Sequence, residues 1–171
     1  RIDVVVDVIA MTLPDSEALI ARLDSVVSQY VMLSSSDVYR NYELLHRKST
    51  GRPAMLGVDE DSELRTTRYP YRQALPRAED AADRYLDDYD KIPIERAVAR
   101  MSSDWTILRL PMIYGPGDRK RRFRWAIEPI AREESRLQIP AAWASACATY
   151  GYIENVAAAI VASISRVRSI A

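Results

Sequence analysis

Apolar residues in the first third of the chain form two short runs with one amphipathic stretch between them. Residues 3–11 are apolar along nearly their whole length, which predicts a strand buried on both faces. A helix is expected from Leu13 onward, with Asp15 as its N-cap residue. Its apolar positions recur at helical spacing and are Leu19, Ile20, Leu23, Val26 and Val27. Residues 30–33 are the next predicted strand, and together the three elements indicate a right-handed βαβ unit with parallel strands.

The periodic pattern is lost between residues 40 and 84, where glycine, proline and charged residues are frequent. A segment this long inside a compact domain is either a functional loop or a solvated excursion. Its most apolar patch is residues 69–72 (Tyr-Pro-Tyr-Arg), which would pack over a site if the loop is functional.

The helical pattern returns in residues 90–101. Pro93 lacks a backbone N–H and is tolerated only in the first turn of a helix, so the helix is expected to begin near Asp90, with Asp90 as its cap. A third buried strand is predicted at residues 105–110, and a turn at residues 115–118 (Gly-Pro-Gly-Asp).

Residues 119–124 contain the one concentrated basic run of the sequence, which fits a solvated helix face, a phosphate-binding patch or an RNA-binding patch. Extended segments are expected at residues 137–139 and 150–153. Asn155 is expected to cap a final helix. The predicted buried stripe of that helix is Val156, Ala159, Ile160, Ser163 and Ile164.

Strands that alternate with helices predict an α/β fold, with a Rossmann-like parallel sheet and flanking helices. Residues 1–118 are expected to form a partial cofactor domain that includes the excursion at residues 40–84. Residues 119–150 would belong to a small substrate-side region, and residues 151–171 would return to the main domain. Ligands bind at the carboxyl ends of the strands in such sheets, where the hydroxyl-rich residues 34–36 lie.

The composition excludes several classes of function. The 24 basic and 24 acidic residues balance, so global charge does not favour binding to nucleic acid or to an anionic membrane. Cys147 is the single cysteine, which excludes an internal disulfide and fits a reducing, cytoplasmic compartment. With His46 and Cys147 as the only soft ligands, no metal site is expected. No apolar run approaches the ~20 residues of a membrane span.

Three sequence blocks occur in an order that resembles a known family. They are residues 34–39 (Ser-Ser-Ser-Asp-Val-Tyr), the helix in which Glu95 follows Lys91 by four positions, and residues 108–117 (Leu-Arg-Leu-Pro-Met-Ile-Tyr-Gly-Pro-Gly). Residues 150–157 are similar to a late segment of the same family. The chain thus resembles, over most of its length, the extended short-chain dehydrogenase/reductase superfamily, and most of all its NAD-dependent epimerase/dehydratase branch.

The resemblance implies a Rossmann sheet that holds NAD or NADP, with chemistry by a Ser/Thr, Tyr and Lys set. Ser35 takes the position of the family hydroxyl, three residues before Val38. Lys91 takes the position of the lysine that holds the nicotinamide ribose and lowers the pKa of the tyrosine. Pro111 matches a position beside the nicotinamide, and Ala10 matches the region that runs along the cofactor.

The family tyrosine stands four residues before the lysine, a position that Asp87 occupies here. Tyr85 and Tyr89 flank it. Tyr89, two residues before Lys91, meets the lysine only if the backbone there is not helical, which Pro93 makes plausible. Either Tyr89 therefore replaces the family tyrosine, or the site is catalytically impaired.

Two further departures concern the substrate and the cofactor. Met112 stands where nucleotide-sugar members of the family carry asparagine, which weakens the case for a nucleotide sugar. No Gly-x-x-Gly-x-x-Gly turn occurs among the five glycines. In the family this fingerprint and the first strands would precede Arg1, and the last stretch would follow Ala171. The sequence is therefore expected to be part of a longer chain, and on its own to be poorly soluble and unable to bind NAD.

Two functions remain open at this point. The first is an NAD(P)-dependent oxidoreductase or epimerase/dehydratase that acts on a secondary alcohol or ketone of a small molecule, such as a sugar derivative, with Ser35, Tyr89 and Lys91 as catalytic residues. The second is a non-catalytic relative that senses dinucleotides or binds RNA. The expected partner is a small-molecule substrate, and self-association as a homodimer is left open.

Overall fold

A parallel β-sheet forms the centre of the molecule. The computed structural model describes residues 2–46, 48–51, 57–139, 148–164 and 169–170. Its main sheet consists of β1 (Ile2–Asp7), β2 (Val27–Ser35), β3 (Asp104–Leu110) and β6 (Ser169–Ile170), in the order β1-β2-β3-β6. All three strand pairs are parallel.

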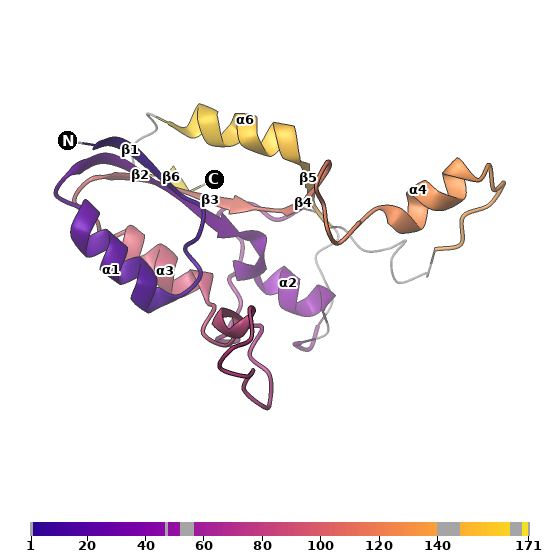
Figure 1. Ribbon diagram of the computed structural model, residues 1–171, viewed down its shortest axis with the longest axis horizontal. Coiled ribbons are helices and arrows are strands. Elements are labelled where there is room, and N and C mark those ends of the chain that lie inside the picture. Colours follow the sequence, from indigo (N-terminus) through magenta and orange to yellow (C-terminus); the bar gives the residue numbers. More distant parts are fainter. Residues whose placement is uncertain (1, 47, 52–56, 140–147, 165–168, 171) are drawn as a thin grey trace.

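Helices cover both faces of this sheet. On one face α1 (Leu13–Leu23) and α3 (Lys91–Val98) lie side by side, and on the other face lies α6 (Ile153–Ser163) (Figure 1). The parallel strands with helices on both faces confirm the predicted α/β, Rossmann-like arrangement.

The main core lies between the sheet and the pair α1 and α3. Its buried members are Ala10, Val27, Tyr30, Met32, Ile94, Val98, Met101 and Ile107. Side chains alternate along β2, so Tyr30 and Met32 enter this core while Gln29 faces α6. The Gln29 amide donates to Thr106 Oγ1 at 3.2 Å and to the Ser163 carbonyl at 3.1 Å. Both faces of the strand are thus covered, which explains why its central residues 30–33 are continuously apolar.

The first strand and helix differ from prediction at their boundaries. β1 ends at Asp7 instead of Met11, because the Asp7 carboxylate accepts hydrogen bonds from the Ile9 backbone N–H at 3.0 Å and from the Tyr30 hydroxyl. The N-cap position of α1 belongs to Thr12, whose hydroxyl donates to Asp15 at 2.6 Å. Asp15 therefore lies inside the first turn and is not the cap. Within the described sheet β1 pairs with β2 alone, so it lies at an edge of that sheet.

A small second ladder extends the sheet region beyond β3. It pairs β4 (Met112–Tyr114) with β5 (Tyr150–Tyr152) in parallel, and α4 (Arg124–Ala131) projects away from it (Figure 1). The predicted extended segment at residues 137–139 joins no strand among the described residues.

The last helix begins earlier than the sequence indicates. Tyr152 is the N-cap of α6, so Asn155 lies inside the helix and does not cap it. Of the predicted stripe, Val156 and Ser163 are buried, whereas Ala159 and Ile164 are exposed. The buried stripe is therefore narrower than predicted, and at its end the Ser163 carbonyl accepts from the Gln29 amide.

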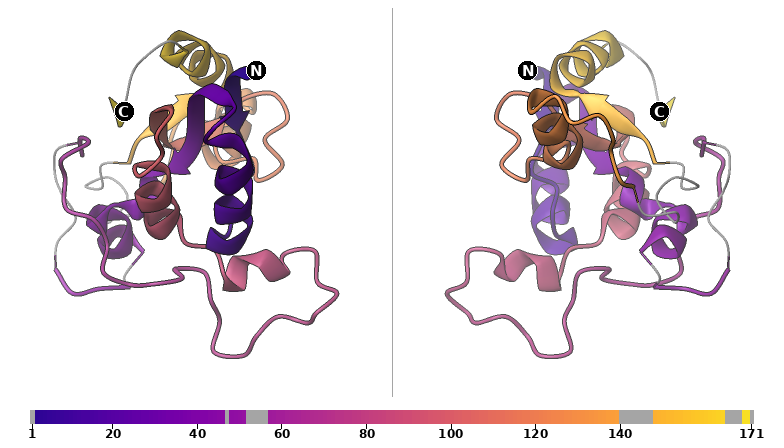
Figure 2. Two further views of the ribbon diagram at one scale, coloured as in Figure 1. Left: turned by 90° about the vertical axis from the view of Figure 1, so that its left-hand side faces the viewer. Right: turned by 90° about the vertical axis from the view of Figure 1, so that its right-hand side faces the viewer.

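The excursion after β2 is structured in part. It contains η1 (Ser36–Val38), α2 (Arg40–Leu45) and η2 (Arg84–Asp87). An isolated antiparallel bridge joins Tyr39 to Leu64, and the Arg65 backbone N–H donates to the Val38 carbonyl at 2.7 Å. Figure 2 shows much of the segment between residues 57 and 84 running as a wide loop at the end of the molecule opposite α6. None of the helices in the described parts of the chain has the length and apolarity that a membrane crossing requires.

Candidate active site at the carboxyl edge of the sheet

The carboxyl ends of β1, β2 and β3 meet at one edge of the sheet. In the strand register Asp7 pairs with Met32, and Ser35 pairs with Leu110. The hydroxyl-rich end of β2 continues directly into η1, and α3 begins beside it with Lys91. Four polar side chains gather there, and they belong to Ser35, Asp37, Tyr89 and Lys91.

Lys91 connects the ends of the first two strands. Its Nζ donates to the Ala10 carbonyl at 2.5 Å and to the Leu33 carbonyl at 3.0 Å, and the residue is 4% exposed. The predicted cap holds it in place, because the Asp90 carboxylate accepts from the Ile92 backbone N–H at 3.2 Å. Burial lowers the pKa of Lys91, and the charges of nearby carboxylates, chiefly that of Asp37, oppose this shift.

The backbone at Tyr89 is not helical. This was the condition under which Tyr89 could lie close to Lys91. It falls between η2 and α3 and forms an isolated antiparallel bridge with Thr12. The Lys91 Nζ lies 5.6 Å from the centroid of its ring. The prediction of a non-helical Tyr89 is thus confirmed, and the structure brings Ser35, Tyr89, Lys91 and Ala10 together.

The hydroxyl of Tyr89 faces a carboxylate. It donates to Asp37 Oδ2 at 3.0 Å. Burial raises the pKa of Tyr89, the negative charge of Asp37 raises it further, and a hydrogen bond with Ser35 opposes the rise. This direction is opposite to the one that the resemblance implies, in which Lys91 lowers the pKa of the tyrosine. The neutral phenol is therefore the stable form of Tyr89 in this structure.

Asp37 is the residue of this site that the sequence did not indicate. Its Oδ2 accepts from Tyr71 at 2.9 Å as well as from Tyr89, and its backbone N–H donates to Ser35 Oγ at 3.2 Å. Its Oδ1 is buried and has no hydrogen-bond partner in the described parts of the chain. Burial raises the pKa of Asp37, and the hydrogen bonds from Tyr71 and Tyr89 offset part of that rise. The available signal was an aspartate directly after a run of three serines.

The excursion is fixed to this site through the cap of α3. Asp90 accepts hydrogen bonds from Arg65 Nη2 at 2.5 Å, from Arg68 Nε at 2.9 Å and from the Tyr69 backbone N–H at 3.3 Å. The side chains of Arg65 and Asp90 are 0% and 1% exposed. Residues 69–71 are thus held beside the site, where the Tyr71 hydroxyl donates to Asp37.

Asp87 and Tyr85, which precede Tyr89 in the sequence, lie in surroundings different from those of Tyr89. Asp87, at the family's tyrosine position, is buried and accepts hydrogen bonds from the side chains of Arg77 and Arg84 and from the Arg77 backbone N–H. Its contacts are structural, since they close the loop before η2. Tyr85 is 43% exposed on η2.

Pro111 and Glu95 flank the cluster. Pro111 directly follows Leu110, the residue that pairs with Ser35, so it lies at the same edge of the sheet. There it packs against Gly151, where an added Cβ would lie 3.1 Å from the Pro111 ring. Glu95 accepts from Ser34 at 2.5 Å and from Arg109 at 2.9 Å, and these bonds join α3 to the ends of β2 and β3.

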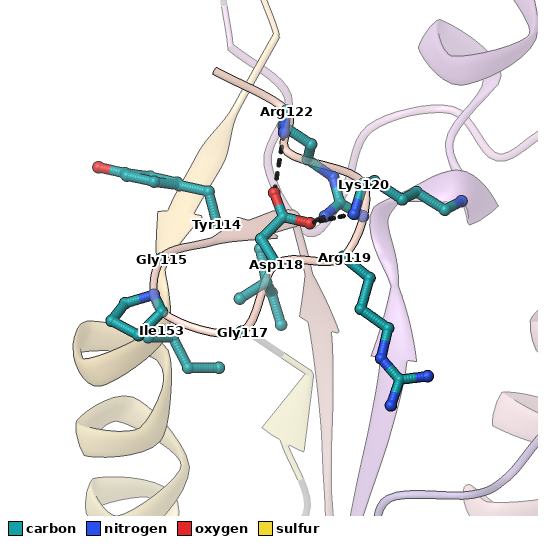
Figure 3. Close-up of a pocket in the computed structure, with 10 residues that line it drawn as sticks. Tyr114, Gly115, Gly117, Asp118, Arg119, Lys120, Arg122 and Ile153 are labelled. Carbon is teal, nitrogen blue, oxygen red and sulfur yellow. Dashed lines mark hydrogen bonds and ion pairs between the residues drawn. The ribbon is translucent and has the colours of Figure 1, made fainter. Parts of the chain in front are cut away.

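A basic loop lines a separate hollow of ≈ 410 Å³ together with Ile153 of α6. The Asp118 carboxylate shapes this loop, because it accepts from the backbone N–H groups of Lys120 at 3.1 Å and Arg122 at 3.0 Å, and from Arg122 Nη1 at 2.6 Å. Figure 3 shows Arg122 turned toward Asp118, while the side chains of Arg119 and Lys120 extend away from the loop. Residues 119–123 are turns and not part of a helix, so the interpretation of the basic run as a helix face is wrong.

Among the residues that the structure describes, no group of three or more His, Cys, Asp or Glu side chains is placed to hold a metal ion. Cys147 falls outside those residues.

Comparisons with known proteins bear on the fold. No protein-family model matches the chain, and no curated protein matches it. One similar solved structure is a functionally unknown conserved protein from Silicibacter pomeroyi, at 17% identity and a TM-score of 0.55, with 98% of this chain and 50% of that chain covered.

A second similar structure is a mutant UDP-glucuronic acid 4-epimerase from Bacillus cereus, in complex with UDP-4-deoxy-4-fluoro-glucuronic acid and NAD. It has 15% identity and a TM-score of 0.56, and the match covers 99% of this chain and 53% of that chain. This chain therefore spans about half the length of both structures. At these identities the likeness establishes the fold alone, an α/β parallel sheet of the Rossmann type.

Proposed function

We propose that this chain carries the catalytic residues of an NAD(P)-dependent oxidoreductase or epimerase/dehydratase that acts on a secondary alcohol or ketone of a small molecule, such as a sugar derivative. The observation that carries the proposal is the convergence of Ser35, Tyr89 and Lys91 at the carboxyl edge of a parallel sheet. These residues come from three separate segments, and Tyr89 reaches the lysine through a non-helical backbone.

A nicotinamide dinucleotide is the cofactor that we assign to this edge of the sheet. Ala10 and Lys91 meet at the ends of β1 and β2, and Pro111 follows β3 at the same edge, where ligands of parallel sheets bind. These three residues would hold the nicotinamide end of NAD or NADP. When bound, such a cofactor supplies the acceptor or donor for hydride. The shared fold of the epimerase that contains NAD supports this assignment.

In this proposal each side chain of the site has a separate chemical role. The Ser35 hydroxyl donates a hydrogen bond to the substrate oxygen, and Tyr89 exchanges a proton with that oxygen. Lys91 positions the cofactor ribose and places a positive charge beside both Tyr89 and Asp37. The basic loop with Arg119 and Lys120 offers positive charge in its own hollow, which would suit a phosphorylated or otherwise anionic part of the substrate.

The test uses the natural full-length protein, purified without added cofactor. Released NAD(H) or NADP(H) is identified by absorbance and chromatography after denaturation, and binding of each dinucleotide is measured by calorimetry. Turnover is then screened with nucleotide sugars and simple secondary alcohols. Dinucleotide binding together with turnover that depends on Lys91 is the expected result. The absence of dinucleotide binding in the full-length protein would overturn the proposal.

A non-catalytic dinucleotide sensor is the second candidate. The raised pKa of Tyr89 favours it, because a phenol held neutral by burial and by Asp37 is a poor base on its own. Binding of dinucleotide without turnover of any alcohol or ketone would select this alternative. Tight, salt-sensitive binding of RNA would instead select an RNA-binding relative.

A further inference from the structure

We propose that Asp37 and Tyr71 relay the proton that Tyr89 exchanges, so that the acid–base unit of the site is a hydrogen-bonded chain from Tyr89 through Asp37 and Tyr71 to the surface. This proposal rests on the proposed function, since it concerns the same site. It assigns a role to the buried carboxylate of Asp37 and to Tyr71 of the excursion. Neither residue belongs to the proposed catalytic set of Ser35, Tyr89 and Lys91.

The three side chains form a continuous path. Tyr89 donates to Asp37 Oδ2 at 3.0 Å, and Tyr71 donates to the same oxygen at 2.9 Å. The hydroxyl of Tyr71 lies 3.0 Å from that of Tyr42. The rings of Tyr71 and Tyr89 contact each other edge to face, with centroids 5.1 Å apart. Every step is thus within hydrogen-bond distance, as proton transfer requires.

The path leads from the interior to solvent. Tyr89 and Asp37 are 6% and 2% exposed, so neither exchanges protons with bulk water directly. Tyr71 is half-buried and lines an open hollow of ≈ 730 Å³ on the excursion, together with Lys48 and residues 67–74. The hydrogen bonds of Asp90 to Arg68 and to the Tyr69 backbone hold this part of the excursion against the site. The loop therefore supplies the outer end of the path.

Asp37 is suited to accept a proton because its carboxylate is incompletely satisfied. Both tyrosines donate to Oδ2, while the buried Oδ1 has no hydrogen-bond partner among the described residues. A buried carboxylate with one unsatisfied oxygen is a stronger base than a solvated one. The groups that face it and set its protonation are Arg65, Lys91, Tyr42, Tyr71, Tyr89 and Ser35.

The proton balance is as follows for oxidation of a secondary alcohol. The alcohol O–H bond breaks and its proton moves to Tyr89 Oη, while the proton of Tyr89 moves to Asp37 Oδ2. The electron pair of the C–H bond leaves as hydride to an oxidised nicotinamide cofactor, and the C=O bond forms. Protonated Asp37 then passes its proton to Tyr71 Oη, and Tyr71 releases its own proton toward Tyr42 or water in the hollow. Reduction runs the same path in reverse.

The decisive measurement needs no substrate. In the full-length protein, NMR of labelled tyrosine gives the rate at which the Tyr89 hydroxyl exchanges its proton with water. Tyr71→Phe removes the outer carrier and is expected to slow this exchange by about tenfold or more, since each positioned carrier contributes at least that much. The exposed Tyr85→Phe, outside the path, is the matched control and should leave the rate unchanged. A purely structural role for Tyr71 predicts faster exchange instead, because loosening the site admits water.

Two further variants, Tyr42→Phe and Asp37→Asn, test the relay in case Tyr71→Phe does not fold. Tyr42→Phe alters only the hydroxyl that contacts Tyr71 and should slow exchange less than Tyr71→Phe does. Asp37→Asn keeps an acceptor oxygen but removes the base, and in protein that turns over it should lower kcat about 100-fold with little change in KM. It should also remove the fall of the oxidation rate at acidic pH, where protonated Asp37 no longer accepts. Unchanged Tyr89 exchange in both tyrosine variants overturns the relay, while loss of dinucleotide binding is the separate failure of the proposed function.

Discussion

At the scale of single residues, Lys91 contributes both to the stability of the fold and to the proposed activity. Its amine joins the ends of β1 and β2 through the Ala10 and Leu33 carbonyls, and it lies beside the ring of Tyr89. A solvated lysine would be nearly neutral for stability, but this one is 4% exposed and bonded to the main chain. Stability and activity therefore both depend on it.

Lys91→Ala should abolish turnover and also lower the free energy of unfolding by about 1–3 kcal/mol, because two buried carbonyls lose a charged donor. Urea denaturation and a steady-state assay of the same preparation check both parts. Lys120→Ala, at an exposed lysine of the basic loop, is the stability control and should shift unfolding by less than about 0.5 kcal/mol. Unchanged activity in Lys91→Ala would remove this residue from the site.

Tyr89→Phe should lower turnover about 100-fold or more, whereas Tyr85→Phe should leave it close to wild type. The reason is geometric: the Tyr89 hydroxyl bonds to Asp37 beside Lys91, and Tyr85 is 43% exposed on η2. Comparison of kcat for the two variants, with the folded state checked by circular dichroism, decides between them. Equal losses would mean that neither phenol is the acid–base group.

The pH dependence of stability should report Asp37. Burial raises its pKa in the folded protein, so the folded state binds this proton more tightly than the unfolded state. The stability it contributes is fully present below the unfolded pKa and is lost as pH rises through the folded pKa. Asp37→Asn should therefore flatten this part of the profile and be at least as stable as wild type at neutral pH. Chemical denaturation at mildly acidic and neutral pH measures the difference, and an unaltered slope would contradict it.

At the scale of elements, Asp90 couples the excursion to α3. It caps the helix, pairs with Arg65 at 2.5 Å in a buried salt bridge, and also bonds to Arg68 and to the Tyr69 backbone. The packing of Tyr71 against Asp37 depends on this connection, because Tyr69 and Tyr71 belong to the same short stretch of chain.

Asp90→Ala should cost about 3–5 kcal/mol, since it leaves the buried Arg65 charge without its partner and removes a helix cap. Arg40→Ala is the matched control: its pair with Glu63 is exposed, at 41% and 63% of the side chains, and should contribute less than about 1 kcal/mol. Thermal unfolding of the two variants gives the comparison. Similar small losses in both would show that the excursion is not anchored at Asp90.

The sequence predicts elements well where one local cause is dominant. Pro93 placed the start of α3 and the Asp90 cap correctly, because proline tolerates only the first turn. The sequence pattern did not predict the end of β1, because the hydrogen bond from Tyr30 to Asp7 joins residues that are far apart in the chain. Asp37 was missed for the same reason: its partners Tyr71 and Tyr89 are brought to it by the fold, and no spacing rule relates them.

At the scale of the whole molecule, packing is uneven. The sheet and the helices α1 and α3 share one buried core, whereas α4 projects from the small β4–β5 ladder and has no buried residue. Its apolar side chains Ile127 and Ile130 are 60% and 68% exposed. Stability should therefore be concentrated in the sheet.

Hydrogen exchange should show this division. Amides of β2 are expected to exchange slowest, near the rate set by global unfolding, while those of α4 exchange through local opening at far lower free energy. Mass spectrometry of peptides after timed exchange measures both regions in one sample. Equal protection of α4 and β2 would indicate that α4 is held by contacts that this structure does not contain.

Asp87 links its position to two arginines, so that a change at this one residue affects all three. The position that holds tyrosine in the family resembled here now holds a buried carboxylate that binds Arg77 and Arg84. Asp87→Tyr alone would leave both guanidinium groups without that carboxylate. The loop before α3 therefore behaves as one electrostatic unit, in which Arg77, Arg84 and Asp87 can be exchanged for other residues only together.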